Sequence, residues 1–134
     1  MPENPSAAGK SMKYVPYPHF SKDEIMLALS NPDDGDAFSE ALASAAMFLQ
    51  PEDFDACLGV AVRQVRTPEN QWAIAVAIQT VAQARRILPT NAEEILLGIP
   101  DGELTSPSRD GALEVIALMR ASGRFVWPNS APGP

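Results

Sequence analysis

The sequence predicts an all-α protein of about six helices, for three reasons. Apolar residues recur every three or four positions over most of the chain, which is the spacing of a helix face turned toward a core. Capping residues, prolines or acids stand where these stretches begin. The apolar fraction of 46% is that of ordinary globular proteins, and 134 residues suffice for one domain. We therefore expect a single helical domain over residues 21–125, between arms at 1–20 and 126–134.

Proline marks the two arms, because it lacks the backbone donor that a helix interior requires. Residues 1–20 contain four prolines and end in aromatic side chains that are apolar enough to dock on the domain. Residues 126–134 contain three prolines and a glycine. No segment of the chain has the apolar length of a signal peptide or of a membrane span. We therefore expect a cytoplasmic protein with no membrane partner.

The first two helices are predicted from their ends. A capping box, Ser21-Lys22-Asp23-Glu24, opens the first helix, since its serine and glutamate can satisfy the free backbone amides there. This helix should end at Asn31-Pro32, because the residue before a proline disfavours the α region. The second helix should begin near Asp36 and turn four apolar residues inward: Phe38, Leu42, Ala45 and Leu49.

The third and fourth helices each open at a proline. Pro51 suits the first turn of the third helix, whose apolar stripe runs from Phe54 to Val65. The fourth helix should run from about Pro68 to Leu88 and is the most apolar of the set. A helix that is apolar on several sides is usually buried on several sides. We therefore expect this helix, with Trp72 near its start, to be the central element.

The segment after the fourth helix allows two predictions. Asn91 can cap a short fifth helix, whereas the turn sequence Asp101-Gly102 can form a hairpin over residues 95–105. The Ala-Glu-Glu run that follows the asparagine favours the helix. The sixth helix should open at Ser106-Pro107 and stop at Gly123, a typical residue after a helix end.

Three of the helix starts share a pattern. Five residues after Pro32, Pro68 and Pro107, an alanine is followed by a large apolar residue. The prolines are 36 and 39 residues apart, and such spacings are typical of repeats made from paired helices. One pair cannot bury its own apolar face, so neighbouring pairs stack. The sequence is thus consistent with an internal repeat.

This arrangement resembles the HEAT/armadillo-like class of α-helical repeats over residues 21–122, most closely from Trp72 to Ala82. The resemblance implies three stacked antiparallel helix pairs. The chain departs from the family at the turn before this helix, where Asn70 and Gln71 precede Trp72 and the aspartate and arginine common in the family are missing. An irregular helical bundle is the alternative architecture.

The charge of the chain bears on its partners. The formal net charge is −7, and an acidic chain repels phosphate, so we expect no nucleic-acid partner. Opposite charges speed encounter between proteins, so a basic protein is the expected partner. The single cysteine, Cys57, excludes an internal disulfide and suits a reducing compartment.

Few residues in the sequence can carry a reaction. His19 and Cys57 are the only histidine and cysteine, and nothing in the sequence brings them together as a nucleophile and base. One cysteine and one histidine do not make a zinc site, and no phosphate-binding glycine loop occurs. We expect no catalytic residue, no metal, no cofactor and no enzymatic activity.

Acidic residues gather at helix starts. Asp33, Asp34 and Asp36 lack the alternation of a calcium loop, so we interpret them as capping acids at the positive end of a helix. In a stack of paired helices they should share one edge with Glu69 and Asp110 and offer a negative strip to a basic protein. Trp72 or Trp127 should supply the anchor. The predicted partner-binding residues are Asp33, Asp34, Asp36, Glu69, Asp110 and Trp127.

The function predicted from the sequence is that of a non-catalytic protein-interaction module. The chain is small, acidic, helical and without catalytic motifs, and in this it resembles bacterial immunity proteins, which neutralise a toxin by covering its site. One alternative is a helical protein that binds a small apolar ligand in a pocket lined by Met26, Met47 and Met119. The other alternative is an enzyme with an unrecognised carboxylate site.

Overall fold

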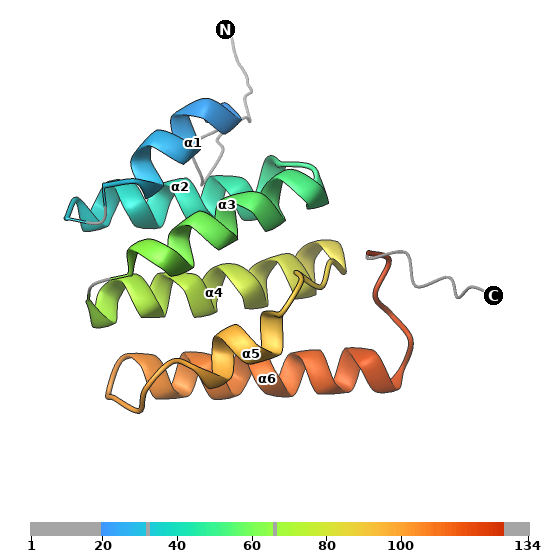
Figure 1. Ribbon diagram of the computed structural model, residues 1–134. Helices are drawn as coiled ribbons and strands as arrows, with labels where there is room; N and C mark the ends of the chain where they lie inside the picture. The colour runs from blue at the N-terminus through green and yellow to red at the C-terminus, as the bar shows by residue number, and fades with distance from the viewer. Residues whose placement is uncertain (1–19, 32, 66, 128–134) are drawn as a thin grey trace, which may run out of the picture.

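The computed structural model describes residues 20–31, 33–65 and 67–127, which contain six α-helices and no β-strand (Figure 1). The prediction of an all-α protein is confirmed, and residues 95–105 form a helix end and a loop rather than a hairpin. The predicted arms fall almost wholly outside the described residues. The helices are α1 (Lys22–Leu29), α2 (Gly35–Phe48), α3 (Pro51–Gln64), α4 (Pro68–Arg85), α5 (Ala92–Leu97) and α6 (Thr105–Ala121).

The six helices lie in two rows. α2, α4 and α6 lie side by side and run in the same direction, and α1, α3 and α5 run back between them on one side (Figure 1). α4 is the middle member of the inner row and packs most extensively against α6 and α2. This order is compatible with the three stacked antiparallel pairs predicted from the sequence.

The interior of α4 explains its central place. Ala73, Ala75 and Ala77 alternate with larger apolar side chains, and all three alanines are buried. Small side chains let helix axes approach closely, so α2 and α6 both come close to α4 and the large residues fill the space between them. None of the helices in the described ranges is both long and apolar enough to cross a bilayer.

The predicted helix starts are observed, with local differences. The Ser21 hydroxyl accepts from the Glu24 amide at 3.2 Å, and the Glu24 carboxylate accepts from the Ser21 amide at 2.8 Å, which completes the capping box. Thr67 caps α4 by accepting from the Asn70 amide at 3.1 Å. Asn91 stands at the start of α5 with φ 61° but makes no side-chain capping bond, so α5 has a weaker start than predicted.

α4 ends at Arg85, three residues earlier than predicted. Arg86 adopts a left-handed conformation with φ 58°, and its amide and that of Ile87 donate to carbonyls of the last turn. This pattern is that of a Schellman motif, here without glycine. The chain then meets the segment after α6, where the Leu88 amide donates to the Trp127 carbonyl at 2.8 Å. The C-terminal segment is thereby fastened to the end of α4.

We predict that Ala75→Leu lowers the free energy of unfolding by about 1–3 kcal/mol, because Ala75 is fully buried and added methylenes have no free volume there. Ala84→Leu, the same change at an exposed position of the same helix, should change that free energy by less than about 0.5 kcal/mol. Urea denaturation followed by circular dichroism measures both. Equal losses in the two variants would contradict the central burial of α4.

Candidate functional site

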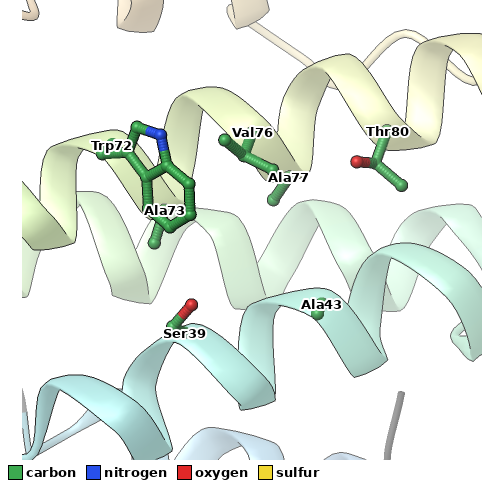
Figure 2. A pocket seen from close by; sticks show the side chains of 7 residues that line it. All are labelled: Ser39, Ala43, Trp72, Ala73, Val76, Ala77 and Thr80. Atoms are coloured by element: carbon green, nitrogen blue, oxygen red, sulfur yellow. The ribbon is translucent and has the colours of Figure 1, made fainter. Parts of the chain in front are cut away.

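One side of the inner row is not covered by any other helix of the described residues. Figure 2 looks across the seam between α2 and α4, and the α3 ribbon lies behind that seam. The side chains on the near side are only partly buried, as expected where no second row covers them. We call this side the open face; its residues include Ser39, Ala43, Trp72, Val76, Thr80, Gln83, Val115 and Leu118.

Three hollows lie on the open face. The middle hollow, about 170 Å³, follows the seam between α2 and α4 and is lined by Ser39, Ala43 and Trp72 among others. The acidic hollow, about 330 Å³, adjoins it at the starts of α2 and α4 and shares Ser39 and Trp72 with it. The basic hollow, about 320 Å³, lies where α4 and α6 end, with Arg86 and Arg124 in its wall. Together they indent the open face at three places.

Trp72 is the largest side chain of the open face. Its indole lies over the seam between α2 and α4, above Ser39 (Figure 2), and lines both the middle and the acidic hollow. The ring is partly buried and packs against the core, so its position is fixed while one side of it stays accessible. An aromatic ring held in this way loses little conformational entropy when a partner covers it.

The structure brings together two of the five predicted acids. Asp36, at the start of α2, and Glu69, at the start of α4, both line the acidic hollow with Leu104. Both belong to exposed first turns, where a carboxylate is stabilised by the positive end of the helix dipole. Their meeting follows from the parallel course of α2 and α4, which places the two helix starts at one end of the layer.

The other predicted acids have local roles or neighbours. The Asp34 carboxylate caps α2 by accepting from the Ala37 amide at 3.1 Å, and Asp33 is exposed just before it. Asp110 accepts from Arg109 at 2.9 Å. The same guanidinium donates to the Ile99 carbonyl at 2.8 Å, which ties the start of α6 to the preceding loop. These three acids do not line the acidic hollow.

Trp127, the other predicted anchor, is not part of this group. It lies beside Leu88, beyond the end of α4, whereas Asp36 and Glu69 stand at the starts of α2 and α4. Its side chain is partly buried and packs on the core, as expected for the C-terminal segment. The tryptophan that lies beside Asp36 and Glu69 is therefore Trp72 and not Trp127.

Sequence reasoning missed the small residues and the arginines of the open face. Ser39 and Ala43 stand four residues apart on α2, a helical spacing that was readable as a face of small residues. Arg86 and Arg124 are 38 residues apart and belong to the ends of different helices, so only the fold brings them together. Leu104, which precedes α6, joins the acidic hollow for the same reason.

A further hollow of about 550 Å³ lies on the opposite side of α4, lined by residues of α3, α4 and α5 that include Val62, Ile74 and Ile95. The pocket of methionines considered above does not form. Met26 and Met119 belong to α1 and α6, which lie at opposite ends of the stack (Figure 1). Of the three methionines, Met119 borders the basic hollow.

Cys57 is a residue of the hydrophobic core. Cys57 is fully buried in the core, and this burial raises the pKa of its thiol to about 11. The thiol therefore stays protonated at neutral pH, and the thiolate is the nucleophilic form. His19, its conceivable partner, lies outside the described residues. Within the described ranges, no three histidine, cysteine, aspartate or glutamate side chains are grouped as metal ligands would be.

Comparison of the chain with known protein families, curated proteins and solved structures finds no match.

The raised pKa predicts how Cys57 reacts. At pH 8 a thiol with a pKa of about 11 has about a hundredfold less thiolate than one at 9.0, so alkylation by iodoacetamide should be slower by at least that factor in the folded protein than in 6 M guanidinium chloride. The folded pKa is raised, so the contribution of the protonated thiol to stability is present below pH 9 and is lost as the pH approaches 11. Cys57→Ala should remove this component of the pH dependence. A folded protein whose thiol is alkylated as fast as the unfolded chain would contradict the burial.

Proposed function

We propose that this protein is a non-catalytic protein-binding module whose open face receives a protein partner with a basic patch. The observation that carries the proposal is the position of Trp72, which lines two adjoining hollows while Asp36 and Glu69 stand at the edge of one of them. A fixed aromatic side chain is typical of the centre of an interface, and accessible charges are typical of the rim around it.

The sizes of the two hollows beside Trp72 favour a protein over a small molecule as their occupant. Pockets that enclose drug-sized ligands have volumes of about 300–1,000 Å³ and bury most of the ligand. The middle hollow, at about 170 Å³, holds one or two side chains, and the acidic hollow at about 330 Å³ is at the lower limit. A protein can place separate side chains in both and cover Trp72 between them.

The charges of the acidic hollow favour a basic partner. Ion pairs among the described residues involve neither Asp36 nor Glu69, so both carboxylates are available to a cation from outside. Their surroundings keep them hydrated before binding, so they contribute more to the rate of encounter and to specificity than to affinity. The net charge of −7 acts in the same direction over longer distances.

More narrowly, we propose that the chain is an immunity protein in the cytoplasm of a bacterium. There it neutralises a toxin by covering the toxin's own basic site. Such a role requires a complementary surface and no reaction centre, which accords with the protonated, buried thiol of Cys57. Its test is neutralisation in cells: expression of the chain should rescue cells from a toxin encoded beside it, and Trp72→Ala should abolish the rescue.

Site-specific photocrosslinking in the source cells tests the broader proposal. A photoreactive phenylalanine analogue at Val76, on the open face, should form a discrete adduct with a partner. The same analogue at Leu27, which is 75% exposed on α1, should not form that adduct. An identical adduct from both positions, or none from position 76, would refute binding at the open face.

Substitution of each tryptophan identifies the anchor. Trp72→Ala should weaken binding of the captured partner about 30-fold or more, since truncation of a central aromatic anchor costs 2 kcal/mol or more. Trp127→Ala should change the affinity less than about threefold, because Trp127 lies away from the acidic hollow. Titration calorimetry measures both, and circular dichroism verifies that both variants fold. The reverse ranking would move the binding site to the C-terminal segment.

A further inference from the structure

The open face is polarised from one end to the other. Asp36 and Glu69 stand at the acidic hollow, and Arg86 and Arg124, both exposed, stand at the basic hollow. Glu69 lies in the first turn of α4 and Arg86 directly follows its last residue; they are 17 residues apart, which corresponds to about 25 Å along the helix axis. Because acids lie at one end of the face and cations about 25 Å away at the other, a charged segment bound there would have one preferred orientation.

The three hollows follow one another along one side of α4, and we call this line the track. Gln83, in the basic hollow, follows Trp72 by 11 residues, which is three helical turns and returns to the same side of α4. Between them, a side-chain carbon on Gly111 of α6 would lie 3.6 Å from the carboxamide oxygen of Gln79, so the Gln79 side chain lies against α6 there. The track thus begins on the α2 side of α4, at the acidic hollow, and ends on the α6 side, at the basic hollow.

Most of the side chains along the middle of the track are apolar. Ala43 and Ala73 line the middle hollow with Val76, and Leu118, 58% exposed, stands at the basic hollow. Small residues in this region allow another backbone to approach, and parallel helices leave grooves into which the side-chain ridges of a further helix fit. The exposed Leu118 can contact an apolar side chain of a partner.

The charges at the ends of α4 also stabilise that helix, because acids favour its start and cations its end. This accounts for Glu69 and Arg85 within α4. The dipole of α4 does not account for Arg124, which follows α6 and donates to the Ser122 hydroxyl at 2.9 Å. Nor does it account for the position of the acids at one hollow and of the arginines at another. The polarity of the face therefore exceeds what the stability of α4 requires.

We propose that the segment bound on this track is an amphipathic helix of the protein partner, about five turns long and antiparallel to α4, with acidic residues in its first turn and lysine or arginine in its last turn. The length is that of the track. Antiparallel placement sets the acids of the bound helix on Arg86 and Arg124 and its cations on Asp36 and Glu69, and the same distribution complements the dipole of the bound helix itself. The proposal rests on the proposed function and specifies its partner.

Selection from a phage library of helix-forming 20-residue peptides, with randomised positions on one face, tests this inference without knowledge of the partner. The targets are the full chain and three variants: Asp36→Lys with Glu69→Lys, Arg86→Glu with Arg124→Glu, and all four changes together. A fourth variant, Glu52→Lys with Arg63→Glu, changes exposed charges of α3 away from the open face and serves as the control.

We expect the full chain and the control variant to enrich peptides with acids at the start, an aromatic or large aliphatic residue in the middle and cations at the end. Each charge-reversed pair should bind the selected peptides about tenfold more weakly or worse, and the variant with all four changes should enrich the opposite order of charges. Trp72→Ala should lose the enrichment altogether. Neutralising changes, Asp36→Asn with Glu69→Gln and Arg86→Gln with Arg124→Gln, test the same point in folded proteins if a reversal disturbs folding.

Several outcomes would overturn the inference: no enrichment, peptides with charges of one sign only, or enrichment that the charge variants leave unchanged. Sedimentation velocity on the same proteins tests whether a second copy of the chain occupies the open face instead. Self-association of the full chain that is abolished in both charge-reversed variants would show that it does. The proposed function fails separately, by the absence of an adduct at position 76. An adduct without helical peptides in the selection would leave the protein-binding role standing and remove only the helix.

Discussion

The close packing of α4 between α2 and α6 is the interaction on which the rest of the structure depends. Its alanines let the two neighbouring helices approach, and its larger apolar side chains then fill the space between them. Because α4 is buried on both flanks, the side that bears Trp72 and Val76 is the side left over. The open face is thus a consequence of how the core is made, and a change that loosened the core would also displace the site.

Because α2, α4 and α6 run in the same direction, the charged residues at their ends gather at the two ends of the open face. Each helix benefits from acids at its start and cations at its end, and in isolation this has no consequence beyond that helix. When α2 and α4 run in the same direction, their first turns meet, and Asp36 comes to the same hollow as Glu69. The residues after α4 and α6 meet in the same way at the other end, with Arg86 and Arg124. The parallel course of the helices therefore gathers charges from helix ends that are distant in the sequence at opposite ends of one face.

Several of the described reactive and charged groups have a structural role. Cys57 is kept protonated by burial, and three cations tie one helix to another: Arg120 with Glu93 at 2.6 Å, Lys22 with Asp53 at 3.0 Å, and Arg85 with the Ala46 carbonyl at 2.9 Å. These ties cross from one helix to another and hold the stack in register. The charged groups at the two ends of the open face have no comparable function inside the fold, which is why they carry the proposals made above.

The sequence alone determined the helical class, the number of helices, most of their starts and the burial of α4, because helix periodicity, caps and prolines act within a few residues of one another. The capping box at Ser21 and the cap at Thr67 were readable in this way. The tertiary structure decided which side of α4 stays open, that Trp72 and not Trp127 stands with the acids, and that Arg86 meets Arg124. These depend on which helices become neighbours and in which direction they run. That choice is made by the fit of whole apolar faces between segments distant in the chain, and no local pattern encodes it.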